Sequence, residues 1–349
     1  MKIPNSNHIK VEELRIKHFS MLHNIKNIKL QNKLQSKFIS NLALQTQENL
    51  FKFIPKKSSL MLIALRGNLP IAFLEVKPYN IQGTCFIIQP IKILTSSDKD
   101  NISMRDIIQP FFESIISEGN LKAKSLIIRS TYQNKEILRL SRENGFQKLK
   151  AINIMKYQGK LEAFTQDKIS SEVNYEWQKI NKENAISLFR LEQTSESSHL
   201  RQILDRQWKD LLNYENDINR IIRIKNFKYS NPIAGLVQRS VTENCVSIEL
   251  VRDCSWDERL FYIIPNLINE FKKEQKEVLI EINAEDDKMT ILMERFGWVI
   301  HDVEILLARS IWRRRVSSRH ISAASSIEDI IGNLNPQQPP LPSPSLRQR

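Results

Sequence analysis

The sequence predicts an α/β fold made of two similar halves, each with a mixed, mostly antiparallel sheet flanked by helices. Apolar runs rich in β-branched residues alternate with segments whose apolar residues recur every three to four positions, as in strands and amphipathic helices. One order of strand, polar break, helix and glycine occurs twice, at residues 126–146 and 278–298. Residues 316–349 are rich in Ser and Pro, which predicts a disordered tail.

The second copy of this pattern shows each element clearly. Residues 278–282 form an apolar, β-branched run and are predicted to be a buried strand. Either Asp286 or Asp287 is expected to cap the helix that follows, because a carboxylate accepts hydrogen bonds from free backbone N–H groups. Gly297 is expected to end that helix with a left-handed residue. The first copy reads LIIRSTYQNKEILRLSRENGF and reaches its glycine at Gly145.

The repeat continues upstream of both copies. Asn-Pro or Leu-Pro followed by Ile-Ala opens a short apolar strand at Pro70 and again at Pro232, and Cys85 and Cys245 each begin the next strand. The offset within these pairs drifts slowly, as loop insertions would cause. We interpret this as a diverged duplication of a β-β-α-β-α-β unit. The predicted domains are 1–160 and 161–315, followed by the tail 316–349, with a polar linker at 158–172.

The remaining elements follow from the same patterns. Strands are predicted at residues 11–19, 60–65, 71–76, 85–94, 148–157, 175–180, 220–224, 232–237, 245–251 and 303–308. Helices are predicted within 9–53, 103–117, 181–193, 197–212 and 257–271. Pro90 marks a break or bulge in its strand, and Pro265 predicts a kink in its helix, because proline has no backbone N–H.

The composition limits where the protein acts. The chain has 349 residues, 41% of them hydrophobic, which suits two domains with real cores. No run of eighteen apolar residues occurs, so no membrane span is expected. The N-terminus lacks an apolar signal core, and three cysteines form no disulfide framework. These features together predict a cytoplasmic protein.

The net charge is +13, and much of it lies at the front of the chain. Residues 1–60 hold eleven Lys or Arg against three Asp or Glu, a balance of +8. Such an excess attracts polyanions, so contact with nucleic acid or a ribosome is one hypothesis. A solvated, lysine-rich surface is the more ordinary interpretation, because the aromatic residues that interleave with basic ones in nucleic-acid modules are missing.

The repeated unit resembles the GCN5-related N-acetyltransferase (GNAT) family over most of residues 1–315. In that family a strand, an Asn, a short helix and a Gly-Phe pair close the acyl-CoA site. Asn134 stands eleven residues before Gly145, at the family's usual place for this Asn. The resemblance implies two tandem GNAT-like domains, with acetyl-CoA or another acyl-CoA as co-substrate. It further implies an N-acyltransferase whose amine acceptor is unknown.

The resemblance also implies a cofactor site in the first half. The family's phosphate-binding loop contains glycine, but neither 96–106 nor 252–260 does. Asp253, Asp257 and Glu258 in the second loop would repel phosphate, which favours the first half. The residues expected to bind the cofactor are Ile93, Leu94, Ser96, Ser97, Lys99, Asn101, Ser103 and Asn134.

The candidates for catalysis depart from the family pattern. The family acid, a Tyr four residues before the glycine, is replaced by Ser141 in the first half and Met293 in the second. The serine hydroxyl is a weak acid, and the methionine side chain has no proton to donate. The candidate bases are Glu75 and Glu249, although a Glu in such a strand is more often a solvent-facing side chain.

Two hypotheses about function therefore stay open. The fold favours an acyl-CoA-dependent N-acyltransferase. The missing glycines and tyrosine favour a non-catalytic GNAT-fold scaffold that binds RNA, a ribosome or a protein. A third hypothesis is an unrelated pair of α/β domains. The His and Cys residues show no metal-ligand spacing, and no nucleotide-binding or nucleophile motif occurs.

Overall fold

The structure is a computed structural model that describes residues 9–23, 25, 28–50, 58–94, 103–117, 123–159, 175–212, 219–224, 232–241, 245–267 and 277–311. The predicted linker beyond residue 159 and the predicted tail lie outside these residues. Within the described ranges, no helix has the length and apolar content needed to cross a membrane.

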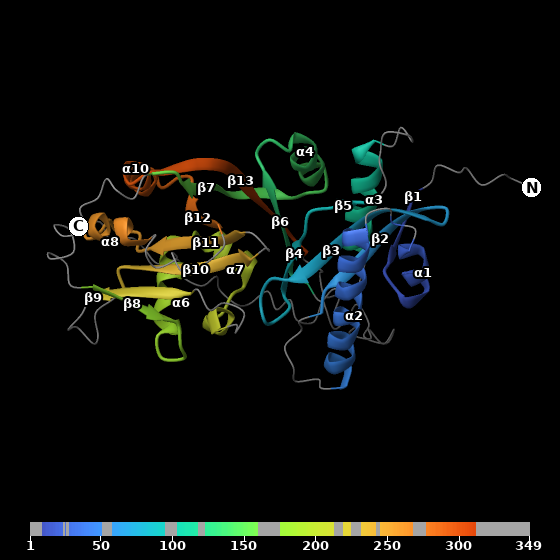
Figure 1. Cartoon of the computed structure of the whole chain (residues 1–349), viewed down its shortest axis with the longest axis horizontal. Coiled ribbons are helices and arrows are strands. Elements are labelled where there is room, and N and C mark those ends of the chain that lie inside the picture. Colours follow the sequence, from blue (N-terminus) through green and yellow to red (C-terminus); the bar gives the residue numbers. More distant parts are fainter. Residues whose placement is uncertain are drawn as a thin grey trace, which may run out of the picture. The chain divides into compact units, whose positions relative to one another are not determined.

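The two halves contain corresponding elements (Figure 1). The first half has β1 (Ile9–Glu13), α1 (Phe19–Leu22), α2 (Ile28–Leu50), β2 (Leu60–Arg66), β3 (Leu69–Pro78), β4 (Cys85–Ile88), β5 (Lys92–Ile93), α3 (Met104–Ser117), β6 (Ser125–Thr131), α4 (Lys135–Glu143) and β7 (Gln147–Tyr157). The second has β8 (Tyr175–Lys179), α6 (Ala185–Ser195), α7 (Ser198–Leu204), β9 (Arg220–Ile224), β10 (Ala234–Val241), β11 (Cys245–Arg252), α8 (Leu260–Ile263), β12 (Glu277–Asn283), α10 (Asp287–Arg295) and β13 (Trp298–Ser310).

The duplication predicted from the sequence is confirmed by these elements. Cys85 opens β4, which runs parallel to β6, and Cys245 opens β11, which runs parallel to β12. Gly145 and Gly297 follow α4 and α10 with φ of +77° and +84°. Both glycines therefore end a helix in the left-handed conformation that residues with a Cβ avoid.

Helices cover both faces of the sheet in each half. Alternate residues of β2 point to opposite sides: Leu62 and Ala64 pack with α3 and α4, whereas Met61 and Ile63 pack with α1 and α2. In the second half α8 and α10 pack on one face, while α6 and α7 pack on the other. Period-two burial of this kind is what a strand between two helical layers requires.

One predicted helix, 257–271, is interrupted within its described part. Leu260–Ile263 is α-helical, a 3₁₀ turn follows at Ile264–Asn266, and Leu267 is helical again. Pro265 lies in that turn, where it removes a backbone donor, so the kink falls at the predicted proline. Residues 268–276 lie outside the described part of the chain.

The last strands of the two halves are exchanged. β7 pairs with β12 of the second half, and β13 pairs with β6 of the first. β7 and β13 also pair with each other, so they lie side by side between the halves in Figure 1. The described strands thereby form one sheet in the order β1-β2-β3-β4-β6-β13-β7-β12-β11-β10-β9-β8. Each half is completed by a strand from the other, which the sequence pattern did not indicate.

The end of α7 ties the second half to the β3–β4 connection of the first. Asn80 Nδ2 donates to the Leu204 carbonyl (3.1 Å), and Ser125 Oγ donates to the Ile203 carbonyl (2.6 Å). An apolar cluster also joins residues of both halves, among them Ile127 and Leu200. The halves therefore share a core as well as strands.

Candidate functional site

Each half contains two parallel strands that separate at one end. β4 pairs with β6 only as far as Ile88 opposite Ile128, after which the chain turns at Pro90 and follows β3 as β5. β11 likewise pairs with β12 only as far as Glu249 opposite Glu281. Beyond these points, the backbone groups on the facing edges of the two strands pair with no other described strand. An extended ligand that contains amide groups can pair with such an edge.

Of the predicted cofactor residues, the structure describes Ile93, Leu94, Ser103 and Asn134. Ile93 pairs with Ala72 on β3, and the Leu94 N–H donates to the Ile71 carbonyl (2.8 Å). Ser103 precedes α3, and Asn134 caps α4 by accepting from the Ile137 N–H (3.3 Å). The other four predicted residues, Ser96, Ser97, Lys99 and Asn101, lie outside the described residues.

Ser141 does not reach this gap. It lies on α4, is fully buried, and its hydroxyl has no hydrogen-bond partner among the described residues. Met293, at the corresponding position of α10, is buried in the second-half core. Neither residue presents a polar group to a ligand, so the acid role of Ser141 stays a prediction that its surroundings do not support.

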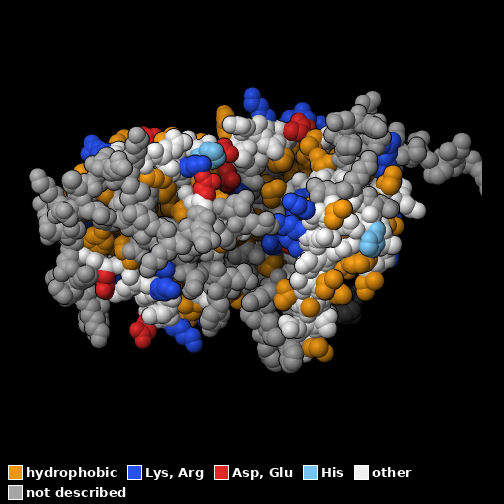
Figure 2. All heavy atoms as spheres, viewed as in Figure 1, with side chains coloured by type: hydrophobic (Ala, Val, Ile, Leu, Met, Phe, Trp, Pro, Cys, Tyr) orange, Lys and Arg blue, Asp and Glu red, His pale blue; other side chains and the backbone are white. Residues whose placement is uncertain are grey.

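Glu75 lies on the face of β3 that α2 covers. Its carboxylate accepts from Lys37 (2.7 Å) and Ser59 (3.1 Å), and Lys77 is 3.7 Å away. Burial alone would raise the pKa of Glu75, but these cations hold it below its usual value. Lys92 lies near the same lysines, and burial together with their charge lowers its pKa. Figure 2 shows basic side chains gathered over the first half.

The second-half gap forms a cavity of about 370 Å³. Its walls come from the ends of β11 and β12, from β7, from the turn between α6 and α7, and from the start of α10. The charged residues that line it are Lys150, Glu196, Glu249, Arg252, Asp253, Glu285 and Asp286. A concave site with convergent polar groups is where small ligands usually bind.

An ion pair crosses the open end of this gap. Arg252, at the end of β11, donates to both carboxylate oxygens of Asp286 (2.7 and 2.8 Å). Asp286 is also the N-cap of α10, which settles the choice between the two aspartates in its favour. The guanidinium of Arg252 additionally lies 5.3 Å from the Trp256 ring centroid. Asn134 holds the corresponding first-half position and carries no charge.

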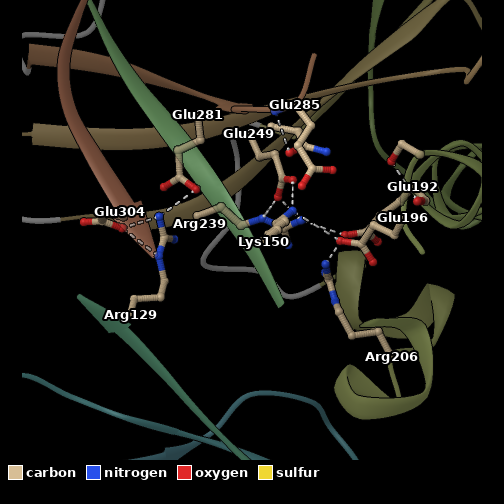
Figure 3. Close-up of polar contacts among 12 residues, drawn as sticks. Arg129, Lys150, Glu192, Glu196, Arg206, Arg239, Glu249, Glu281, Glu285 and Glu304 are labelled. Atoms are coloured by element: carbon tan, nitrogen blue, oxygen red, sulfur yellow. Dashed lines mark hydrogen bonds and ion pairs between the residues drawn. The ribbon is translucent and has the colours of Figure 1, made fainter. Parts of the chain in front are cut away.

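A cluster of buried charges includes Lys150 and Glu249 of the cavity lining and extends away from it through Arg239, Glu192 and Arg206 (Figure 3). Glu192, fully buried on α6, accepts from Arg206 and from Arg239 (2.8 Å). Arg239 also pairs with Glu249, and Lys150 Nζ lies 2.8 Å from that carboxylate. The cluster joins α6, β7, β10 and β11, which are distant in sequence.

A second group of charges continues along the same side of the sheet. Arg129 of β6 lies 3.0 Å from Glu281 and 2.6 Å from Glu304. Glu281 also accepts from Ser247. The Arg129 pairs connect the first-half strand to β12 and β13 of the second half. Figure 3 shows the two groups next to each other.

Two of the carboxyl groups that line the cavity, those of Glu196 and Glu249, have opposite pKa shifts. Burial, which would raise the pKa of Glu249, is outweighed by Arg239 and Lys150, so its pKa falls far below the usual value. Burial and the neighbouring Glu192 raise the pKa of Glu196 to about 7. Glu249, a predicted base, is therefore held as an ion. Glu196 is the carboxyl that changes charge near neutral pH.

Glu196 was missed by sequence reasoning. It stands in a polar turn, Ser195-Glu196-Ser197, where a glutamate is ordinarily solvated. Its importance comes from β7 and β11, whose residues lie about 50 positions away along the chain. No local pattern marks it. Among the described residues, no three His, Cys, Asp or Glu side chains are grouped to hold a metal ion.

Comparisons with known proteins support the fold assignment. No protein-family model matches the sequence, and no curated protein matches it. The glucosamine N-acetyltransferase region of a fungal multi-domain GH3 β-N-acetylglucosaminidase matches with a TM-score of 0.54 and 12% identity. The match covers 86% of this chain and 38% of that one. It shows that this chain has the GNAT fold.

Two further solved structures match over most of both chains. A tandem GNAT protein from the clavulanic acid biosynthesis pathway has a TM-score of 0.49 and 8% identity, covering 87% of this chain and 99% of that one. A GCN5-related N-acetyltransferase from Sphaerobacter thermophilus has a TM-score of 0.48 and 9% identity, covering 89% and 98%.

Proposed function

We propose that the chain is an acyl-CoA-dependent N-acyltransferase. The observation that supports this most is the first-half gap, where β4 leaves β6 at Ile88 and the edge of β6 from Arg129 to Thr131 faces no strand of the described residues. The pantetheine arm of CoA contains two amide groups, which suit pairing with such an edge. The GNAT fold supports the same reaction class.

The residues around this gap favour a ligand that carries phosphate. The start of α3 at Ser103 supplies a helix N-terminus, whose free N–H groups attract anions. Lys77 and Lys92 add positive charge to β3 and β5, which lie next to or follow β4. The predicted loop with Ser96, Ser97, Lys99 and Asn101 connects β5 to α3, and Asn134 and the end of β5 complete the proposed cofactor site.

The proposed reaction is direct transfer. A neutral amine attacks the thioester carbonyl, the new C–N bond forms, the C–S bond breaks, and the thiolate takes up a proton. Glu75 and Glu249 were the predicted bases, but lysine and arginine hold both as ions and make them weak proton acceptors. The proposal therefore rests on cofactor binding and assigns no base in the first half.

A non-catalytic GNAT-fold scaffold is the second candidate function. It is favoured by the two positions of the family acid, because Ser141 is buried and Met293 has no proton to give. Such a protein would bind RNA, a ribosome or a protein partner, with the basic residues of 1–60 as the contact surface.

Calorimetric titration of the full chain with acetyl-CoA separates the candidates. We expect binding to the wild type and weaker binding to Lys99→Glu, since the change replaces a partner of phosphate with a repelling charge. The matched control is Lys288→Glu, at the start of α10 in the second half, which should bind like the wild type. The reverse pattern would place the cofactor in the second half.

Turnover is measured in the same preparation by release of free CoA thiol with a panel of amines. Binding with turnover supports the transferase. Binding without turnover on any amine supports a protein that has kept the cofactor site and lost catalysis. Absence of binding by acetyl-CoA and longer acyl-CoAs rejects the cofactor site and leaves the scaffold.

A further inference from the structure

The second-half cavity contains a buried carboxylate whose hydrogen-bonding capacity is unused. The Glu196 side chain is 5% exposed and lines the cavity. It makes no hydrogen bond to any described residue, and its one ion pair is with Lys150, 3.7 Å away. A buried carboxylate normally accepts several hydrogen bonds, since an unpaired charge away from water is costly.

The cations near Glu196 are committed to other carboxylates. Lys150 of β7 lies closer to Glu249 of β11, at 2.8 Å. Arg239 of β10 pairs with Glu249 and with Glu192 of α6. Glu192 itself adds a like charge beside Glu196. The charged groups that face Glu196 from these four elements therefore leave its negative charge poorly compensated.

The remaining charges on the cavity wall favour a cation as ligand. Five carboxyl groups line the cavity against two cations. Of these two, Arg252 is bound by Asp286, and Lys150 is bound by Glu249. The potential inside the cavity is therefore negative, which disfavours a phosphate or carboxylate ligand.

The cavity also has an apolar part of limited size. Leu149, Leu200 and Ile282 contribute apolar side chains to its lining. A volume of about 370 Å³ is at the low end of the range for small-molecule sites. A ligand with one charged end and a short hydrocarbon body suits a lining that contains both carboxylates and apolar side chains.

We infer that this cavity binds a small primary amine as its ammonium ion. The ammonium donates to the Glu196 carboxylate, and the hydrocarbon body packs against Leu149, Leu200 and Ile282. The site belongs to the second half and is separate from the acyl-CoA site proposed for the first, so either one can fail without the other.

Amine binding at Glu196 is coupled to a proton. In the empty cavity, burial and Glu192 raise the pKa of Glu196 to about 7, so the carboxyl is partly protonated near neutral pH. An ammonium stabilises the ionised form, which lowers this pKa and releases the proton. Affinity should therefore fall as the pH decreases below 7 and the carboxyl has to be deprotonated first.

The test uses n-butylamine, ethanolamine and cadaverine as probes on the full chain at pH 8, without acyl-CoA. Butanol and butyrate, at matched ionic strength, are the neutral and anionic controls. Calorimetry and thermal shift are run on the wild type, on Glu196→Gln and on Ser195→Ala. Ser195 lines the same cavity but carries no charge, and its hydroxyl donates to the Glu192 carbonyl (2.8 Å).

We expect at least one amine to bind the wild type and Ser195→Ala, while butanol and butyrate do not. Glu196→Gln should weaken amine binding about tenfold or more, because a hydrogen bond to a charged group is lost. Proton release, measured separately at pH 6.5 in buffers of different ionisation enthalpy, should disappear in Glu196→Gln alone, because the carboxyl with a pKa of about 7 is still mostly protonated at that pH.

Three results would overturn the inference. These are binding of none of the amines, equal binding of butanol, and unchanged amine affinity in Glu196→Gln. The circular dichroism spectrum and urea melt of Glu196→Gln show whether the variant is folded. If that variant is unfolded, the wild type alone decides the question. Proton release on amine binding should disappear as the pH is raised from 6 to 9, and release that stays constant over this range would overturn the inference.

Discussion

Glu249 and Glu196 share one cation unequally: Lys150 Nζ lies 2.8 Å from the carboxylate of Glu249 and 3.7 Å from that of Glu196. Arg239 adds a second cation to Glu249, whereas Glu192 places a like charge beside Glu196. Two glutamates on one cavity wall thus have opposite electrostatic surroundings. The chain holds one of them as an ion and leaves the other to titrate near neutral pH.

Replacing the two glutamates should affect stability in opposite ways. Glu249→Gln leaves Arg239 and Lys150 without their shared counter-ion, and breaking a buried pair of this kind costs about 3–5 kcal/mol. Glu196→Gln removes a poorly compensated charge and should cost little or increase stability at pH 8. Urea melts at pH 8 measure both changes. Equal losses in the two variants would contradict the assigned difference in surroundings.

The stability gained by Glu196→Gln should depend on pH. The pKa of Glu196 is about 7 in the folded chain and 4.5 when unperturbed, so between these values the folded state holds a proton that the unfolded state has released. Stability of the wild type therefore falls as the pH rises from about 4.5 to about 7, by up to roughly 3 kcal/mol in all, and changes little above that.

Glutamine does not titrate, so the variant lacks this loss. The difference in unfolding free energy between Glu196→Gln and the wild type should grow from pH 5 to about pH 7.5 and stay level from there to pH 8.5. The comparison cancels the other titrating groups, which both proteins share. A difference that stays constant over this range would show that Glu196 has an ordinary pKa.

The two helix-ending glycines should differ in their tolerance of alanine. A Cβ on Gly145 would meet only the flexible Arg309 side chain, at 3.6 Å, whereas a Cβ on Gly297 would lie 2.8 Å from the Gly159 Cα. Gly145→Ala should cost about 1 kcal/mol for the positive φ alone. Gly297→Ala should cost more, on the order of 2–3 kcal/mol, since backbone must also move. Equal losses of unfolding free energy in the two variants, measured by urea melts, would mean that the backbone at residue 159 moves aside without a measurable cost.

The exchanged strands predict that neither half folds alone. Without residues 161–349, β6 loses its neighbour β13, and β7 loses both β12 and β13. Unpaired strand edges of this kind favour aggregation. Separately expressed 1–160 and 161–349 should be insoluble or form larger species, while co-expression should yield a one-to-one complex on size-exclusion chromatography. A monomeric 1–160 that melts cooperatively would contradict the exchange.

The sequence alone was sufficient to predict features that depend on a few neighbouring residues. Gly145 and Gly297 mark helix ends because only glycine adopts their backbone conformation without strain. Asp286 caps its helix through a bond three residues away. Pro90 separates β4 from β5 because it cannot donate to a ladder. Because the same order of strand, helix and glycine occurs in both halves, these local signals also revealed the duplication and its GNAT-like order of elements.

The tertiary structure decided which half completes each sheet and which carboxyl titrates. A strand such as β7 shows the same alternation of apolar residues whether its neighbour is β6 or β12, because backbone hydrogen bonds do not distinguish partners. The pKa of Glu196 likewise depends on its distances to Lys150 and Glu192 and on burial by four separate elements. Electrostatic energies follow distance and dielectric surroundings, and sequence order specifies neither until the chain has folded.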